Sequence, residues 1–467
     1  MSVVIPRSCI ENEVAIHLRK VLYFKSIPTN RYDTSGNISV LFYLLKDIEN
    51  YSLFLENKEL SESDIKSFVI KDNKMKMLFL PFQYGRLLLQ QQGLQRYLLK
   101  TYPVISDMKF TGDLREYQKS IVDESKEYLD RQDSILISIP TGKGKSVIGA
   151  YLSCQEKLLT IVLYHRTKLG TQWQNTFAKN TNCKTWIVGD KITNETITVI
   201  LCLDRRVKDL PEIYRRSIGM VIIDECHTFN TPSHVECLMS LTPKKIIGLS
   251  ATMNRLDKME IMMSSVCGEK IVERKEDRSF TVVKITTDFK SKREYENNRL
   301  KWSTLIQSLL YNPNRNTLII DIINNPGKYL GDSKPHKIIC LTSEKKHALL
   351  LNKLVADSDY LCGTKNDYKD SRCLFGTLSK LSTGFDESNA CKDFKGITSD
   401  LLLIVCSIKN INTLIQSVGR VFRNSAPSII HIIDDDSIIV SHYNGCKKWY
   451  REKNAMFREI DLRKSVD

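Results

Sequence analysis

One stretch of the chain has the residue types of a phosphate-binding loop. Residues 138–146 read SIPTGKGKS; they follow a short apolar run, residues 135–137, and precede a segment that can be helical, residues 147–156. Glycines in such a turn let backbone N–H groups point toward phosphate oxygens, and the helix N-terminus adds a partial positive charge. We predict that Lys145 reaches the β- and γ-phosphates of a nucleotide and that the Ser146 hydroxyl lies on Mg²⁺.

The whole loop is expected to contact the nucleotide. Its members are Pro140, Thr141, Gly142, Lys143, Gly144, Lys145 and Ser146. Ile139 stands where the usual loop opens with a glycine, and Ser146 replaces the more frequent threonine. A glycine turn ahead of a helix is also common as a plain turn, so the interpretation depends on the motifs that follow.

Two carboxylates follow a later apolar run. Residues 220–223 end in Asp224 and Glu225. Runs that are apolar nearly throughout are typical of parallel strands covered on both faces, and ligands bind at the carboxyl ends of such strands. We predict that Asp224 holds Mg²⁺ through water and that Glu225 orients and deprotonates the water that attacks the γ-phosphate. Paired acids can also cap a helix, but the upstream loop favours catalysis. The other runs of this kind are residues 159–164, 197–203 and 245–249.

Polar residues on either side of these motifs complete a nucleotide site. An amide can pair with the N7 and N6 groups of adenine, so Gln118, ahead of the loop, is a candidate adenine reader, with Arg115 beside it. The hydroxyl residues of the Ser250–Thr252 segment could hydrogen-bond to Asp224 or His227 and report phosphate occupancy. A plain turn is the alternative for that segment.

The second half of the chain contains a helical basic motif, residues 416–423, with the sequence QSVGRVFR. Arg420 and Arg423 are three residues apart and are expected on one face of a helix. There they could act as arginine fingers on the γ-phosphate, with Gln416 at the phosphate or the neighbouring water. A basic helix surface is the alternative. Candidate contacts to a nucleic-acid backbone are Arg166, Thr167, Lys168, Thr377 and Thr383, whereas Trp173 is expected in the core.

Composition limits the function classes. A chain of 467 residues exceeds a single core, and 42% hydrophobic residues are ordinary for a globular protein. The formal charge of +15 favours a polyanionic partner such as DNA or RNA over a merely solubilising surface. The thirteen cysteines form no Cys-x-x-Cys pair, and no apolar run reaches the length of a membrane span or a signal peptide. We expect free thiols and a soluble intracellular protein.

The pattern of apolar segments predicts an N-terminal module over residues 1–106 and two further domains over 107–275 and 276–467. The module is interpreted either as an accessory substrate-binding or damping domain or as a structural cap. Its expected elements are a helix at 12–23, a strand or buried helix at 38–45, a strand at 77–80 and a helix at 84–99 that buries Leu87, Leu88 and Leu98.

The second sheet is expected to start with the strand at 337–341 and to end with the strand at 429–433. The 434–436 acids cap this last strand, and a basic helix follows around residues 447–453. It either tracks a nucleic-acid backbone or, as we prefer, packs its interleaved aromatic residues Trp449, Tyr450 and Phe457 on the last domain.

Five motifs occur along the chain in an order that resembles superfamily 2 helicases of the DExH-box type. They are the phosphate-binding loop, Asp224-Glu225-Cys226-His227, Ser250-Ala251-Thr252, Ser382–Asp386 and Gln416–Arg423. The resemblance implies an α/β fold class with two tandem RecA-like domains, parallel sheets with helices on both faces, plus a small N-terminal α+β domain. It also implies ATP and Mg²⁺ as ligands and nucleic-acid-dependent ATP hydrolysis. His227, Gly384 and Asp386 match family positions on the nucleotide side.

Finer motifs resemble the DNA-directed branch of that superfamily. They are Arg115-x-Tyr117-Gln118, Thr167-Lys168 followed by Gln172-Trp173, and the segment 250–257. Within this branch the chain most resembles the poxvirus post-replicative transcription helicases. That resemblance implies a DNA-dependent ATPase and 3′-to-5′ helicase that promotes transcript release, with DNA, the RNA polymerase elongation complex and viral elongation factors as partners, in the virion and the host cytoplasm.

Several alternatives remain open from the sequence. They are an RNA helicase or a DNA repair or recombination translocase of the same superfamily, a small-molecule P-loop kinase, and a scaffold without turnover. The kinase leaves residues 416–423 without a task, and the intact Lys145, Asp224 and Glu225 argue against the scaffold.

Overall fold

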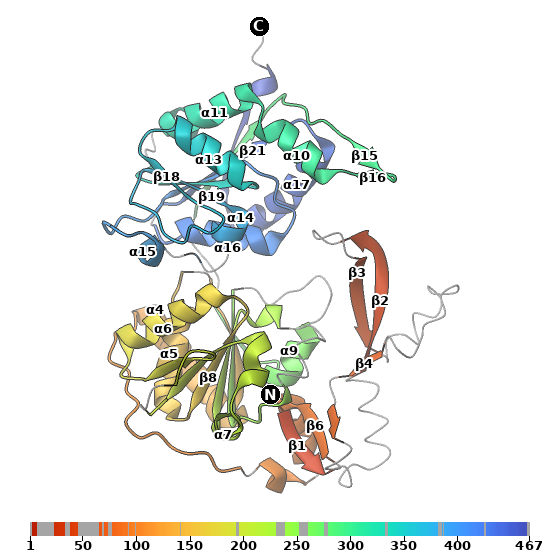
Figure 1. Ribbon diagram of the computed structural model, residues 1–467, viewed down its shortest axis with the longest axis vertical. Coiled ribbons are helices and arrows are strands. Elements are labelled where there is room, and N and C mark those ends of the chain that lie inside the picture. Colours follow the sequence, from red (N-terminus) through yellow and green to blue (C-terminus); the bar gives the residue numbers. More distant parts are fainter. Residues whose placement is uncertain are drawn as a thin grey trace. The chain divides into compact units, whose positions relative to one another are not determined.

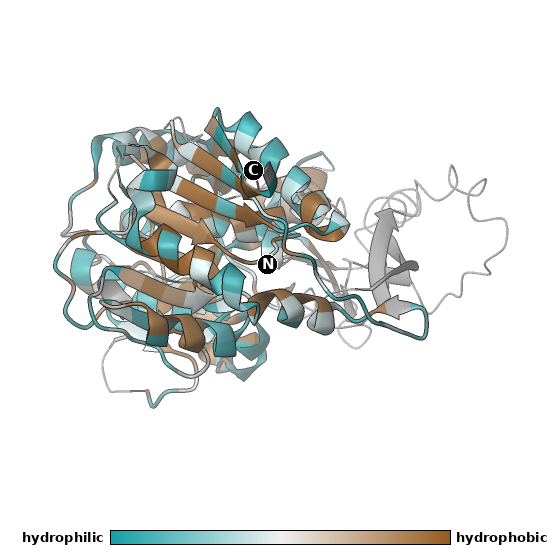
Figure 2. Ribbon diagram, turned by 90° about the horizontal axis from the view of Figure 1, so that it is seen from above, coloured by the Kyte–Doolittle hydropathy of each residue, from teal (hydrophilic) through white to brown (hydrophobic). Residues whose placement is uncertain are grey.

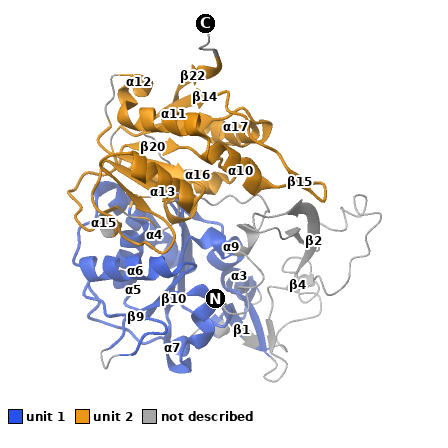
Figure 3. Cartoon of the chain, turned by 45° about the horizontal axis from the view of Figure 1, so that its top comes forward, with its two compact units in different colours: residues 1–139, 144–274 blue, residues 140–143, 275–467 orange. Residues whose placement is uncertain are grey.

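The computed structural model describes residues 2–6, 23–32, 38–44, 65–67, 70–72, 77–91, 93–98, 100–140, 142–192, 196–229, 239–251, 260–274, 279–331, 335–381, 385, 387–424 and 426–464. The chain forms two compact units, residues 1–139 with 144–274 and residues 140–143 with 275–467 (Figure 3). Each unit is built around one seven-stranded sheet (Figure 1).

The sheet of the first unit is parallel throughout and has the order β13-β7-β12-β11-β8-β10-β9. The apolar runs read from the sequence are confirmed as five of its strands, β7 Ser134–Ser138, β8 Thr160–Tyr164, β10 Val199–Leu203, β11 Met220–Asp224 and β12 Lys245–Ser250. The two edge strands, β9 Thr185–Ile187 and β13 Ile271–Glu273, were not expected from the sequence.

Both faces of this sheet are buried. Ile161 and Leu163 of β8 join one apolar cluster, whereas Val162 and Tyr164 join another. Because successive side chains of a strand point to opposite faces, these clusters lie on the two sides of the sheet. Figure 2 shows the apolar strands between helices that carry polar stripes. The helices of this unit are α4 Glu116–Gln132, α5 Lys145–Glu156, α6 Thr167–Asn180, α7 Glu212–Ser217 and α9 Glu260–Cys267, with 3₁₀ turns η5 Asp204–Asp209 and η6 Cys226–Thr228.

The sheet of the second unit is also parallel, with the order β18-β19-β17-β20-β21-β14-β22. Its strands are β14 Thr281–Thr286, β17 Ile338–Thr342, β18 Ser358–Leu361, β19 Cys373–Thr377, β20 Leu401–Ile404, β21 Ser428–Ile433 and β22 Met456–Asp461. Its helices are α10 Trp302–Leu310, α11 Pro313–Asn324, α12 Pro326–Leu330, α13 Lys345–Leu354, α14 Leu378–Leu381, α15 Glu387–Ala390, α16 Ile411–Val421 and α17 Ser437–Glu452. A hairpin of β15 Tyr295–Glu296 and β16 Arg299–Leu300 precedes α10.

Two expectations about this sheet were wrong. The strand at 338–342 is preceded by β14, and the strand at 428–433 is followed by β22. β22 lies at the sheet edge and is half exposed, so its sequence MFREID lacks the continuous apolar run of a central strand. β14 carries Lys284, which interrupts its apolar pattern in the same way.

The basic helix after β21 is confirmed as α17. Asp436 caps it by accepting hydrogen bonds from the N–H groups of Ile438 and Ile439. Tyr450 is fully buried, and its ring contacts those of Phe280 and Phe457. The aromatic residues of this tail therefore pack on the second unit, as preferred from the sequence.

The N-terminal residues form two antiparallel sheets, β1-β6-β5 and β3-β2-β4. The strands are β1 Ser2–Pro6, β2 Tyr23–Tyr32, β3 Ile38–Leu44, β4 Ile65–Ser67, β5 Ile70–Asp72 and β6 Met77–Pro81. Residues 38–44 are thus a strand, one of the two alternatives, and the strand at 77–80 is confirmed. The helix expected at 12–23 lies outside the described residues up to residue 22, and Tyr23 starts β2.

The helix expected at 84–99 is two pieces, α3 Phe82–Gln91 and the 3₁₀ turn η4 Gln95–Leu98. Gly93 lies between them with φ 67°, a left-handed conformation that ends the helix. Leu88 is buried as predicted, but Leu87 is 48% exposed and Leu89 takes the core position instead.

Strands β1 and β6 share the core of the first unit. Val3 and Leu80 belong to the same apolar cluster as Leu136 and Ile246. The Ser2 hydroxyl donates to the carbonyl oxygen of Met239 at 2.6 Å, and Ser134 donates to Gln83 Oε1 at 3.0 Å. These contacts favour the structural cap over the separate accessory domain.

Two findings concern the whole described chain. Each of the eleven cysteines that the structure describes is free and buried. Among the described residues, none of the helices has the length and hydropathy needed to span a membrane.

Candidate active site

The phosphate loop links β7 to α5, and its glycines are required by the backbone. Gly142 has φ 80° and Gly144, which caps α5, has φ 81°, both in the left-handed region that side chains disfavour. Ile139 is 1% exposed, and its N–H donates to the carbonyl oxygen of Ser250 at 3.1 Å. Ile139, which stands where the usual loop has a glycine, is therefore a buried residue that continues the chain of β7. Thr141 lies outside the described residues.

Gln118 lies directly against this loop. A Cβ atom added to Gly144 would lie 2.3 Å from Gln118 Nε2, so only glycine leaves room for the amide there. Gln118 is 3% exposed, and its Oε1 accepts a hydrogen bond from the Arg115 N–H at 2.9 Å. Arg115 caps α4 and its side chain is exposed. The adenine-reading role of this pair stays a prediction, but the amide is in place beside the helix that starts at Lys145.

The two acids stand at the carboxyl end of β11, in the middle of the sheet. Asp224 is 6% exposed and Glu225 is 8% exposed, so both carboxylates are withdrawn from bulk water. Glu225 adopts φ 51°, which turns the chain sharply after the strand. Lys145 Nζ lies 3.7 Å from Glu225 Oε1, so the loop lysine and the candidate base are brought together within the first unit.

The surroundings raise the pKa of Asp224 to about 6. Burial is the largest cause, and the negative charge of Glu225 adds to it. A hydrogen bond from Trp173 and the positive charge of Lys145 act in the opposite direction. A cation next to this carboxylate would favour its ionised form, which is the form that binds metal.

The donor set fits a magnesium ion bound mainly through nucleotide and water. Within the described part of the chain, no group of three or more histidine, cysteine or acidic residues could form an all-protein metal cage. Asp224 is a buried oxygen donor, and Ser146 begins α5 at the loop. Mg²⁺ prefers oxygen ligands and keeps several waters, so these two residues suit it. When bound, the ion would neutralise charge on the phosphate oxygens.

His227 and Ser250 connect the neighbouring strands β11 and β12. His227 Nδ1 lies 2.9 Å from Ser250 Oγ and 3.5 Å from Glu225 Oε2. Ser250 also accepts, through its backbone carbonyl, the hydrogen bond from Ile139 at the start of the loop. The predicted link between the serine and His227 is therefore present. Thr252 lies outside the described residues.

Trp173 is a part of the site that the sequence did not reveal. It is 1% exposed, so its predicted place in the core is confirmed, but its indole Nε1–H also donates to Asp224 Oδ2 at 2.9 Å. The residues are far apart in the chain, and a tryptophan inside an amphipathic helix has no local sign of a polar partner.

The expected strand contacts of the first unit lie after β8. Arg166 caps α6, and Arg166 and Thr167 are exposed while Lys168 is half-buried. β8 pairs with β11, so these residues follow the strand next to the one that ends at Asp224. Arg205 and Lys208, on η5 after the adjacent strand β10, are exposed and add positive charge that the sequence analysis did not single out.

Arg420 and Arg423 differ in their surroundings. α16 ends at Val421, so Arg423 lies in the turn after the helix, and the expected placement of both arginines on one helix face was wrong. Arg420 is 9% exposed; its Nε donates to the carbonyl oxygen of Leu381 at 3.2 Å and its Nη1 to that of Phe385. Arg420 therefore hydrogen-bonds to the backbone at Leu381 and Phe385 within the second unit. Gln416 is half-buried on α16.

The remaining predicted residues of the second unit follow β19. Thr377 ends this strand, is 8% exposed, and its Oγ1 lies 3.2 Å from Ser379 Oγ. Thr383, Gly384 and Asp386 lie outside the described residues.

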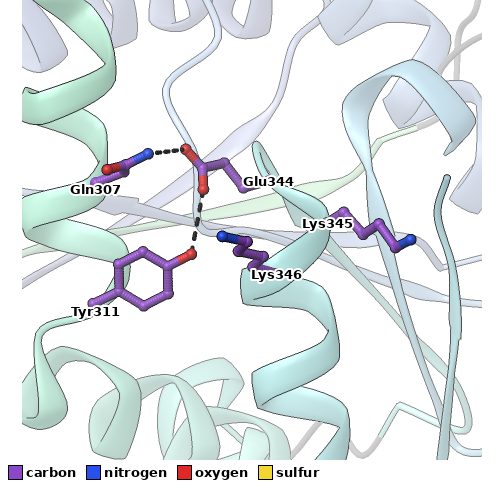
Figure 4. A pocket seen from close by; sticks show the side chains of 5 residues that line it. All are labelled: Gln307, Tyr311, Glu344, Lys345 and Lys346. Carbon is purple, nitrogen blue, oxygen red and sulfur yellow. Dashed lines mark hydrogen bonds between the residues drawn. The ribbon is translucent and has the colours of Figure 1, made fainter.

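A pocket of about 550 Å³ opens on the second unit at the start of α13 (Figure 4). Glu344 stands at its centre and accepts hydrogen bonds from Gln307 Nε2 at 3.4 Å and the Tyr311 hydroxyl at 3.3 Å. Lys345 and Lys346 complete the lining. The pocket lies beside the carboxyl end of β17, the edge at which such sheets bind ligands.

Comparisons with known proteins cover the part of the chain that contains this candidate site. Residues 111–255, which contain the loop and both acids, match the family described as "Type III restriction enzyme, res subunit". A protein of Invertebrate iridescent virus 6 that is named as a helicase is 27% identical over 396 residues, 78% of this chain and 86% of the viral protein. A protein of Acanthamoeba polyphaga mimivirus named as an ATP-dependent RNA helicase is 25% identical over 402 residues, 81% of this chain and 74% of that protein.

Solved structures support the fold. Saccharomyces cerevisiae Dbp5 bound to Gle1 and IP6 matches with a TM-score of 0.50 and 14% identity, over 76% of this chain and 95% of that chain. The two parallel sheets with helices on both faces are therefore tandem RecA-like domains, as the resemblance implied. With these domains, the matching family and the viral relatives, the chain is similar to helicases of superfamily 2, and these relatives indicate an enzyme that hydrolyses ATP in dependence on nucleic acid.

Proposed function

We propose that the chain is a DNA-dependent ATPase that moves along DNA in the 3′-to-5′ direction and acts on transcription complexes to release nascent RNA. The observation that carries the ATPase step is the meeting of Lys145, Asp224 and Glu225 at the carboxyl end of β11, where Lys145 Nζ lies 3.7 Å from Glu225 Oε1. The choice of DNA and of transcript release is supported by the motifs at 115–118, 167–173 and 250–257 and by the poxvirus resemblance.

In the proposed reaction, the chain supplies binding, orientation and one proton acceptor. The loop amides and Lys145 hold the β- and γ-phosphates, and Gln118 with Arg115 contacts the adenine. Glu225 accepts the proton of the attacking water, and Asp224 with Ser146 holds the Mg²⁺ that neutralises phosphate charge. Gln416 and Arg423 act on the γ-phosphate, with Gly384, Asp386 and His227 on the nucleotide side.

The proposed division of the chain is an N-terminal domain over 1–106, a first motor domain over 107–275 and a second over 276–467. The shared core of Val3, Leu80 and Leu136 supports a capping role for the N-terminal strands. We further propose DNA contacts at Arg166, Thr167, Lys168, Thr377 and Thr383. The proposed partners are the RNA polymerase elongation complex and viral elongation factors, in the virion and the host cytoplasm.

The experiment that tests the function is ATP hydrolysis by the purified chain, alone and with single-stranded DNA, duplex DNA or RNA. We expect little activity alone and strong stimulation by DNA. Stimulation by DNA but not by RNA supports the proposal, and release of a labelled transcript from a stalled polymerase complex is then the direct assay. Absence of hydrolysis with every polynucleotide would contradict an ATP-driven motor.

An RNA helicase is the second candidate, because the mimivirus relative is named as an ATP-dependent RNA helicase. Equal or stronger stimulation by RNA in the same assay would select it. Polarity is tested separately with partial duplexes that carry a single-stranded tail at the 3′ or the 5′ end, and displacement from the 5′-tailed substrate alone would overturn the proposed direction.

A further inference from the structure

Trp173 makes an unusual contact for a core tryptophan. Its indole Nε1–H donates to Asp224 Oδ2 at 2.9 Å, with the tryptophan 1% and the aspartate 6% exposed. A buried indole N–H needs an acceptor, and here the acceptor is a carboxylate at the carboxyl end of β11. Hydrogen bonds to ionised acceptors are about twice as strong as neutral ones.

The ring is held in place from two further sides. A Cβ atom on Gly149 of α5 would lie 3.0 Å from Trp173 Cη2, so the indole edge rests against the backbone of the helix that begins with Lys145 and Ser146. The ring of Phe177, one turn further along α6, lies 5.8 Å away. Contacts with α5 and α6 thus fix the orientation of the indole. The hydrogen bond from its N–H in turn fixes the orientation of the Asp224 carboxylate.

This geometry has a chemical consequence. The indole N–H can donate but cannot accept, so it occupies one carboxylate oxygen and cannot exchange roles with water. The Glu225 backbone N–H also hydrogen-bonds to this carboxylate, and with the indole bound at Oδ2 the carboxylate is fixed in an orientation in which it can face a metal-bound water. Groups that orient a metal-holding carboxylate in this way commonly change metal affinity by a factor of ten or more when removed.

We propose that Trp173 is a positioning residue that orients Asp224 for the magnesium of the bound nucleotide. The inference rests on the proposed ATP site but not on the choice of DNA, RNA or transcript release. It assigns to Trp173 a task in nucleotide binding, whereas the sequence alone placed this residue only in the core.

The test is Trp173→Phe, which keeps a ring of similar shape and removes the N–H. The readout is binding of a fluorescent N-methylanthraniloyl-ADP to the full chain as MgCl₂ is titrated. We expect the Mg²⁺ concentration at half-saturation to rise at least about tenfold. Nucleotide binding in EDTA should stay unchanged, because the indole does not touch the loop.

The matched control is Phe177→Leu, on the same helix, equally buried and in contact with Trp173 but not with Asp224. A purely structural role of the ring would shift both variants alike, whereas the proposal predicts a much larger shift in the Mg²⁺ titration for Trp173→Phe, because Phe177→Leu keeps the indole N–H that donates to Asp224. An unchanged titration in Trp173→Phe, or an equal shift in Phe177→Leu, would overturn the proposal.

This result is separate from the test of function. A chain that hydrolyses no ATP with any polynucleotide contradicts the motor, but the Mg²⁺ titration of nucleotide binding still decides the role of Trp173. Thermal unfolding of both variants shows whether either has lost its fold. Should Trp173→Phe fail to fold, Trp173→His keeps a ring N–H in the same place and should restore part of the Mg²⁺ affinity.

Discussion

Asp224 and Glu225 are neighbours in the chain but meet different groups. Asp224 receives the indole hydrogen bond of Trp173, whereas Glu225 lies near the Lys145 ammonium and His227. The positive φ of Glu225 separates the directions of the two side chains. Different surroundings suit different tasks, one carboxylate for a metal and the other for a proton.

Glu225→Gln should therefore abolish hydrolysis without abolishing nucleotide binding. The amide keeps the shape of the side chain but cannot accept the proton of the attacking water, so the polynucleotide-stimulated rate should fall at least about a hundredfold. Steady-state ATPase assays and fluorescent nucleotide binding measure the two quantities. Glu273→Gln, at the exposed end of β13, is the control and should keep full activity.

Gln118→Ala tests the adenine contact. The amide lies against Gly144 at the loop, so its loss should raise the KM for ATP several-fold and reduce the preference for ATP over GTP. The control is Gln132→Ala at the other end of α4, where the amide donates to Ser134. An unchanged ratio of kcat/KM for ATP and GTP in Gln118→Ala would show that Gln118 only packs the loop.

At the scale of elements, hydrogen bonds between distant segments determine whether a side chain of a helix points into its own unit or toward solvent. Arg420 points into the second unit and holds the carbonyl oxygens of Leu381 and Phe385, which flank the segment 382–384. Arg423 lies in the turn after α16 and adds positive charge near the buried Glu387, whose pKa burial raises. The two arginines of one motif therefore have different surroundings.

Arg420→Lys and Arg423→Lys should separate stability from catalysis. A lysine cannot reach two carbonyl oxygens with a planar fork, so Arg420→Lys should lower the free energy of unfolding by about 2 kcal/mol. Arg423→Lys should leave that free energy nearly unchanged and lower the ATPase rate at least about tenfold. Urea unfolding followed by fluorescence, together with ATPase assays, measures both. Equal loss of stability in the two variants would contradict the separation.

At the scale of the whole molecule, buried histidines connect stability to pH. Burial lowers the pKa of His347 to about 3 and that of His431 to about 3. His347 Nε2 lies 2.9 Å from Asn316 Oδ1, and because an amide oxygen only accepts, Nε2 carries the proton of a neutral ring. Both residues are in the second unit, so we expect a fall in pH to lower the stability of that unit.

The second unit should lose stability as the pH falls from 7.5 to 5. The folded pKa values lie below the ordinary value of 6.5, so the unfolded chain takes up more protons, and the stability present above pH 6.5 is lost as the pH falls toward 3. At pH 5 the loss should be about 2 kcal/mol for each histidine. Hydrogen exchange of the β17 and β21 amides at both pH values measures it.

His347→Gln should reduce this pH dependence by about half, because His347 no longer titrates while His431 still does. His336→Gln is the control; its side chain is 73% exposed, so the dependence should persist. A pH response of β17 and β21 that is unchanged in His347→Gln would show that other groups cause it.

Local patterns of the sequence predicted the parallel α/β fold and the residues that we propose for catalysis. The apolar runs that became β8, β10, β11 and β12, and the short motifs at their ends, are visible because strand burial and turn chemistry depend on neighbouring residues. The half-exposed edge strand β22 was not predicted in this way, because a strand that buries little surface does not need an apolar run.

Only the tertiary structure decided which distant residues meet. Trp173 reaches Asp224 because α6 packs against the sheet face below β11, and Arg420 turns inward because the carbonyl oxygens after α14 lie within its reach. Buried Arg315 meets Asp434 at 2.9 Å for the same kind of reason. Such contacts depend on how helices lie on the sheets, and no local spacing in the chain encodes that arrangement.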